Sequence, residues 1–113
     1  MIFENMINEL FVHFPMLKSE YENECDHIEG LAHPCYSFVF VPFIRRAALA
    51  NDEKTLKLVG SFLESMANAE DRAVYDLLGA SVLESMLNEK EVIASLKRYT
   101  GQRTNELLSM KRQ

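Results

Sequence analysis

Two cysteines and two histidines near the amino terminus are the residue types that most often bind zinc. Cys25, His27, His33 and Cys35 all lie within eleven residues. Familiar zinc motifs hold their ligands in pairs at characteristic spacings, and this stretch matches none of them. On a helix, Cys25 and His27 would also point about 200° apart, because residues two apart do not share a face. We therefore expect no metal site, and we interpret Cys25 as a small buried hydrophobic residue.

A cysteine nucleophile activated by a histidine is the second chemistry that these residues could support. Cys35 could pair with His33 or with His13. Catalysis would also require a group that orients the base and a donor that stabilises the oxyanion, and the sequence indicates neither. We interpret the set as a buried thiol and surface imidazoles, and we expect no catalytic residues, no enzyme activity and no cofactor.

A six-residue motif occurs twice, and each copy carries a glutamate. Ser-Phe-Leu-Glu-Ser-Met at residues 61–66 returns as Ser-Val-Leu-Glu-Ser-Met at residues 81–86. Glu64 and Glu84 each directly follow a leucine that belongs to the apolar face of its predicted helix. Such carboxylates can bind metals in helical bundles, but those sites also use Glu-x-x-His motifs, and neither copy contains a histidine. We expect each glutamate to bond a neighbouring polar group or an arginine, and each serine to be a small residue at a close helix contact. The candidate arginines are Arg45, Arg46 and Arg72.

The spacing of apolar residues predicts the helices that position these groups. Apolar side chains recur three and four residues apart through most of the chain, as on a helix with one buried face. Pro15 ends the first helix and suits the first turn of the next, which stops at Gly30. The predicted helices cover residues 2–14, 15–29, 35–51, 52–69, 71–87, 88–99 and 104–110.

Residues 35–41 are the ambiguous part of this pattern. They are rich in aromatic and β-branched side chains, which favour a strand. No second segment offers a partner strand, and an isolated strand has nothing to pair with. We therefore interpret residues 35–41 as a buried helical segment that continues past Pro42.

These segments predict an all-α fold in a single domain over residues 1–113. The two copies of the motif lie on consecutive helices, and we expect Leu63 and Leu83 to be buried. A twenty-residue repeat of helix and turn fits an antiparallel hairpin, and it also fits a pair of helices from a solenoid. The prediction is an irregular antiparallel bundle or a short helical-repeat stack of six to seven helices.

Composition and charge limit the partners of the chain. The formal net charge is −5, which argues against direct nucleic-acid binding, because phosphate contacts require Lys and Arg. The same charge permits a basic partner. The amino terminus does not resemble a signal peptide, and no stretch has the roughly 20 apolar residues that span a bilayer. We expect a cytoplasmic protein with reduced thiols and no membrane contact.

Acidic side chains concentrate in the second predicted helix. Against Lys18 alone, that helix carries Glu20, Glu22, Glu24, Asp26 and Glu29. Residues 97–113 show the opposite bias, with five basic side chains and one acidic side chain. Two interpretations remain open. The acidic helix is either an interaction surface for a basic partner or the internal counterpart of the basic carboxyl-terminal end.

The chain resembles a family of small bacterial all-helical proteins of unknown function. The resemblance rests on Asn51-Asp52-Glu53 through Phe62-Leu63-Glu64 and then on Val82-Leu83-Glu84. In that family an Asn-Asp turn leads into two helices, each with an apolar-Leu-Glu signature. The resemblance covers about the last two thirds of the chain. It implies an immunity role for some members, which are small cytoplasmic proteins that neutralise a toxin delivered by neighbouring cells.

The sequence therefore predicts a binding protein, and the leading hypothesis is an immunity protein for a cognate toxin. Many such toxins are basic nucleases, which suits an acidic partner. The alternative is a regulatory or adaptor helical protein with a different protein partner. The expected contact residues are those of the acidic helix, namely Glu20, Glu22, Glu24, Asp26 and Glu29. The oligomeric state stays open.

Overall fold

The computed structural model describes residues 1–111, apart from the side chain of Cys25. Helices and turns account for its regular structure, and no strand occurs within this range. The α-helices are α1 (Met6–His13), α2 (Lys18–Asn23), α3 (Cys25–Ile28), α4 (Ala32–Cys35), α5 (Val41–Leu49), α6 (Glu53–Ala67), α7 (Arg72–Leu77), α8 (Glu84–Met86), α9 (Lys90–Lys97) and α10 (Gln102–Lys111). Two 3₁₀ segments, η1 (Phe3–Asn5) and η2 (Pro15–Leu17), precede α1 and α2. The all-α prediction is confirmed.

Two π-helical segments join shorter helices into long ones. The segment η3 (Tyr36–Phe40) links α4 to α5, and η4 (Leu78–Leu83) links α7 to α8. Counted as continuous helices, residues 1–111 form eight, slightly more than the six to seven expected. The extra helix arises because the predicted helix over residues 15–29 breaks at Glu24, whose backbone leaves helical geometry (φ −106°, ψ 8°).

Residues 35–41 are helical, as predicted, and Tyr36–Phe40 adopt π geometry just before Pro42. Proline has no N–H to donate to the carbonyl four residues back, so the regular ladder cannot continue through this point. The N–H of Val41 instead bonds the carbonyl of Tyr36, five residues back. Three of the aromatic and β-branched side chains of this segment pack in the core. Tyr36, Val39 and Phe40 are fully buried, and the Tyr36 hydroxyl donates to the carbonyl of Met6 at 2.8 Å.

The core forms around aromatic rings that come from two helices and a turn. Phe14, Phe40 and Phe62 meet with ring centroids 5.4 to 5.5 Å apart, in tilted or edge-on arrangements, which suit aromatic pairs. Leu63 and Leu83 are both 0% exposed. The prediction that the repeated motif supplies two core leucines is therefore confirmed.

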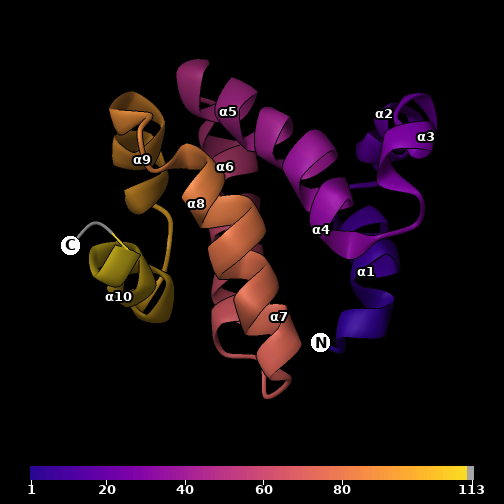
Figure 1. Ribbon diagram of the computed structural model, residues 1–113. Helices are drawn as coiled ribbons and strands as arrows, with labels where there is room; N and C mark the ends of the chain where they lie inside the picture. Colours follow the sequence, from indigo (N-terminus) through magenta and orange to yellow (C-terminus); the bar gives the residue numbers. More distant parts are fainter. Residues whose placement is uncertain (112–113) are drawn as a thin grey trace.

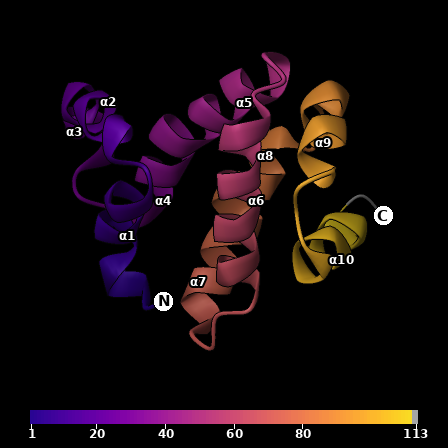
Figure 2. The ribbon, with the colours of Figure 1, turned by 180° about the vertical axis from the view of Figure 1, so that it is seen from behind.

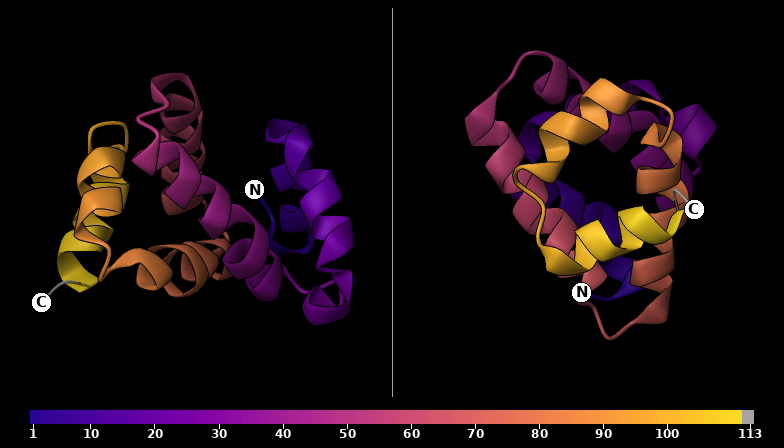
Figure 3. Two further views of the ribbon diagram at one scale, coloured as in Figure 1. Left: turned by 90° about the horizontal axis from the view of Figure 1, so that it is seen from above. Right: turned by 90° about the vertical axis from the view of Figure 1, so that its left-hand side faces the viewer.

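The helices pack as a bundle-like globule. In Figures 1 and 2, α6 and the helix formed by α7, η4 and α8 run antiparallel through the middle of the molecule. Helices α1–α3 lie on one side of this pair, and α9 and α10 lie on the other, as the view from above in Figure 3 also shows. Helix α5 contacts α9, and α6 contacts α10. In a repeat stack each unit contacts only its neighbours, so these contacts favour a globule.

Candidate functional site

The acidic residues predicted as the partner surface lie at one end of the molecule, on α2, on α3 and in the turn after each of them (Figure 1). We call Glu20, Glu22, Glu24, Asp26 and Glu29 the acidic surface. Buried apolar residues hold the two short helices in place, because Leu17 is 1% exposed and Ile28 is 0% exposed. Tyr21 adds an edge-on contact with Phe11 at 5.2 Å between ring centroids. The inward side of this end is therefore fixed by core contacts, and the carboxylates are left to the outer side.

Four of the five acidic residues form no ion pair with any other residue in 1–111. Glu20 bonds Arg46 on α5 at 2.7 Å, across an exposed contact. Glu22, Asp26 and Glu29 are exposed, and Glu24 is half-buried. Within residues 1–111, none of these four carboxylates lies within 4.0 Å of a basic group. The sequence alone did not separate Glu20 from the other four.

The arrangement of these residues around one continuous helix was predicted wrongly. That prediction assumed an unbroken helix over residues 15–29. The break at Glu24 and the left-handed backbone of Glu29 (φ 52°) interrupt the regular turn. The acidic surface is thus formed by two short helices and the turn after them, and its outline cannot be read from helical spacing.

The basic carboxyl-terminal end does not neutralise the acidic surface. Helices α9 and α10 lie on the far side of the central pair from α2 and α3 (Figures 1 and 3). Of the basic residues in 97–111, Lys111 alone forms an ion pair, with Glu84 at 3.3 Å. Arg112 lies outside the described residues. Within residues 1–111, the interpretation that the two charged ends pair within the fold is therefore wrong, and these ends lie on opposite sides of the central pair.

Glu64 on α6 bonds the first turn of α10. Its Oε1 accepts from the N–H and the hydroxyl of Thr104, at 3.0 and 2.8 Å. Its Oε2 accepts from the N–H of Arg103 at 3.1 Å and from the side-chain amide of Asn68 at 3.0 Å. Burial acts to raise the pKa of Glu64, but these hydrogen bonds outweigh it and hold the pKa below its ordinary value. The carboxylate acts as a helix cap supplied by another helix.

Two glycines make this contact possible. A Cβ at Gly101 would lie 2.5 Å from the side chain of Glu64, and a Cβ at Gly60 would collide with the carbonyl oxygen of Tyr99. Neither position has room for the Cβ atom of another residue. Because these two residues have no Cβ, the loop before α10 can lie directly on α6. Gly60 and Glu64 are one turn apart on that helix.

The expected arginine partners of the two motif glutamates are wrong. Glu64 bonds the α10 terminus, and Glu84 bonds Lys111 at 3.3 Å. The three arginines pair elsewhere, in Arg45–Glu89, Arg46–Glu20 and Arg72–Asp76. The broader expectation, that each glutamate bonds a neighbouring polar group, holds for both. The pairs differ from those expected because each contact joins helices whose relative positions depend on the tertiary fold.

The serines of the motif also differ from their expected role. Ser81 is 6% exposed and lies at a close contact between helices. Ser61, Ser65 and Ser85 are exposed, so they do not mediate close packing. Ser65 and Ser85 instead donate to the carbonyls of Ser61 and Ser81, four residues earlier.

The cysteine and histidine residues are dispersed over different environments. Burial raises the pKa of the Cys35 thiol to about 12, which opposes thiolate formation. His33 bonds the hydroxyl of Ser81 through Nδ1 at 2.5 Å, and His27 is exposed. The side chain of Cys25 lies outside the described residues, so its expected burial is not described. In the part of the chain that is described, no three His, Cys, Asp or Glu residues are grouped to hold a metal ion.

Two contacts were missed by the sequence analysis. The His33–Ser81 bond joins residues 48 apart, and the Glu64–Thr104 bond joins residues 40 apart. The first has no signal in the sequence. The second contact had a partial signal in the sequence, because Thr100-Gly101 indicates a helix break just before Thr104. Neither contact belongs to a known sequence motif.

Comparison with known proteins places the chain in a family. No helix within residues 1–111 is both long and apolar enough to cross a bilayer. The chain matches no curated protein and no solved structure. A family model described as a domain of unknown function, DUF7674, matches residues 7–113. The chain therefore belongs to the DUF7674 family.

Proposed function

We propose that the chain is an immunity protein that binds and neutralises a basic protein toxin through the acidic surface. The observation that supports this proposal most directly is the set of carboxylates at Glu22, Glu24, Asp26 and Glu29, which form no ion pair in the described part of the chain. They lie together at one end, while the basic residues of α9 and α10 lie at the other (Figure 1). The proposal places the protein in the cytoplasm, where it meets a toxin after delivery.

The charge arrangement suits capture of a basic partner. A surface with one sign of charge accelerates the encounter with an oppositely charged protein, by a factor of about 10 to 1,000. Carboxylates without an internal partner are available for that attraction, and no existing ion pair has to break. Glu20 differs, because it already bonds Arg46 at 2.7 Å. We therefore assign the main contribution to the other four residues.

The alternative function is that of a regulatory or adaptor helical protein that binds another protein partner. The same acidic surface would serve it, so the surface does not distinguish the two functions. Toxicity of the partner does distinguish them. An immunity protein must protect cells from its partner, whereas an adaptor binds without protecting.

The test starts from the protein encoded immediately upstream of this chain. Its carboxyl-terminal domain is expressed in bacteria with and without the chain, and both growth and complex formation on gel filtration are measured. The proposal predicts growth arrest by that domain alone and recovery with the chain. A complex without toxicity would support the adaptor. Toxicity without protection and without a complex would contradict both functions for this partner.

A further inference from the structure

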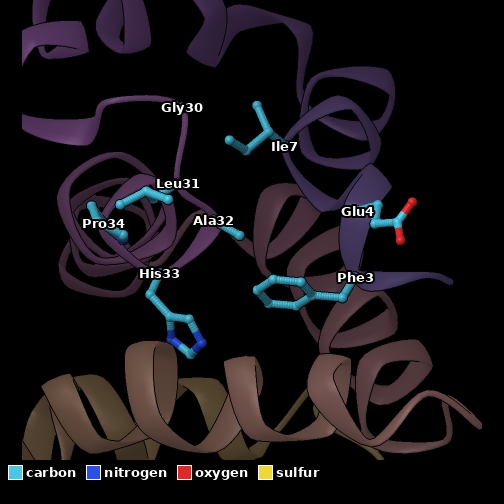
Figure 4. Close-up of a pocket in the computed structure, with 8 residues that line it drawn as sticks. All are labelled: Phe3, Glu4, Ile7, Gly30, Leu31, Ala32, His33 and Pro34. Carbon is cyan, nitrogen blue, oxygen red and sulfur yellow. The ribbon is translucent and has the colours of Figure 1, made fainter.

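A pocket opens between the amino-terminal segment and α4. Its volume is about 410 Å³, within the range of roughly 300–1,000 Å³ that small-molecule sites occupy. Apolar side chains form most of its wall, as Figure 4 shows. They are Phe3, Ile7, Leu31, Ala32 and Pro34. His33 adds one polar ring to this apolar wall.

The backbone of Phe3 and the ring of His33 both bond the helix formed by α7, η4 and α8. The backbone N–H of Phe3 donates to Oδ2 of Asp71 at 2.9 Å, and the other oxygen of Asp71 caps α7 by accepting from Ala73. His33 bonds Ser81 on η4, one segment further along that helix. Figure 4 shows the imidazole of His33 beside the ring of Phe3. Their centroids are 5.8 Å apart, so the pocket has a preformed ring pair.

Ser81 is itself held in place, because the two π segments meet at this residue. Its side chain is nearly buried, at 6% exposed. Its carbonyl accepts from the hydroxyls of Ser85 at 3.0 Å and Ser37 at 3.3 Å. A π segment offsets the regular hydrogen-bond ladder, and such segments are frequent at functional sites. The two serines thus hold the backbone of Ser81, whose hydroxyl bonds Nδ1 of the exposed His33.

The chemistry of the pocket selects its ligand. With Nδ1 bonded to Ser81, the remaining polar atom of His33 is Nε2, which is a donor in one tautomer and an acceptor in the other. A hydroxyl can bond either form, since it both donates and accepts. Glu4 also lines the pocket, and its negative charge disfavours an anion there. We propose that this pocket binds a small neutral aromatic alcohol, whose ring packs on Phe3 and whose hydroxyl bonds Nε2 of His33.

The test uses three probes of one ring size, namely 2-naphthol, naphthalene and 2-naphthoate. Each is titrated into the full chain while backbone amide resonances are recorded by NMR. The proposal predicts saturable shifts at residues 3, 7 and 31–34. It also predicts an affinity for 2-naphthol about three to ten times that for naphthalene, the value of one net hydrogen bond, and the weakest binding for 2-naphthoate. Equal affinities, no saturation, or shifts centred elsewhere would overturn the proposal.

Two variants locate the binding. His33→Phe keeps a ring but removes both nitrogens, so it should abolish the preference for 2-naphthol and preserve naphthalene binding. Ile7→Trp should fill the pocket and abolish binding of both. Val12→Trp on the same helix is the matched control, because Val12 is 67% exposed, and it should bind as the original chain does. If Ile7→Trp fails to fold, His33→Phe decides the outcome. An unchanged preference in His33→Phe would overturn the proposal.

Discussion

Replacement of Glu64 by glutamine should destabilise the fold, because it removes acceptors from the first turn of α10. The carboxylate has two oxygens, and each accepts two hydrogen bonds. Glutamine keeps one oxygen and places an NH₂ group at the other position. Two of the four donors then face a donor. At about 0.5–1.5 kcal/mol per net hydrogen bond, the free energy of unfolding should fall by about 1–3 kcal/mol.

Glu84→Gln is the matched control, because Glu84 occupies the same position in the second copy of the motif. Its exposed ion pair with Lys111 is worth about 0–1 kcal/mol. The assay is urea denaturation of both variants, followed by the helical circular dichroism signal. A loss in Glu64→Gln no larger than that in Glu84→Gln would refute the capping role. Toxin binding should survive both changes, since neither residue belongs to the acidic surface.

The effect of Glu64 should also depend on pH. Its pKa is lower in the folded chain than its ordinary value of 4.5. The folded state therefore favours the charged form, and the stabilisation is fully present above the unfolded-state pKa. As pH falls from about 4.5 through the lower folded-state value, both states become protonated and the difference between the original chain and Glu64→Gln should shrink. A constant difference from pH 7 to pH 3 would contradict this explanation.

Three further predictions concern the core and its close contacts. Leu63→Ala and Leu83→Ala should each reduce the free energy of unfolding by about 2–5 kcal/mol in urea titrations, and a loss below about 1 kcal/mol would be inconsistent with burial. Gly60→Ala should destabilise the chain, although alanine favours a helix by about 1 kcal/mol, because its Cβ would collide with the carbonyl oxygen of Tyr99; an increased unfolding midpoint would refute that contact. Alkylation of Cys35, followed by peptide mass spectrometry, should proceed only as fast as the chain opens, and rapid modification in the native state would show an accessible thiol.

Helix type and core positions were predictable from the sequence because they depend on local spacing. The apolar stripes placed Leu63 and Leu83 in the core, and the lack of a partner strand excluded a sheet at residues 35–41. The π geometry just before Pro42 was not predicted, because it depends on which backbone carbonyl accepts the N–H of Val41. The break at Glu24 was also missed, because no proline or glycine marks it.

The candidate sites were less predictable, because they depend on contacts between distant segments. The acidic surface was identified by composition, but the pairing of Glu20 with Arg46 required the position of α5. The capping role of Glu64 and the orientation of His33 by Ser81 both join residues at least 40 apart. The sign of each charge is evident from the sequence, but the ion-pair partner of each charge depends on the tertiary fold.

The most direct test of the proposed function is the rate at which the chain associates with the toxin. Glu22→Lys with Asp26→Lys changes the net charge of −5 by +4, to −1. Glu70→Lys with Glu91→Lys makes the same change at exposed residues away from α2 and α3, and it serves as the control. Surface-based binding kinetics are recorded at 0.1 M and 1 M salt, where the Debye length falls from roughly 10 Å to roughly 3 Å.

Charge reversal on the acidic surface should slow association about tenfold at low salt, and the control should slow it less than about threefold, because steering depends on where the charges lie. At 1 M salt the two double variants should associate at similar rates. Helical circular dichroism of both should match the original chain. If association at low salt is unchanged, or if both double variants slow it equally, the acidic surface is not the toxin-binding face.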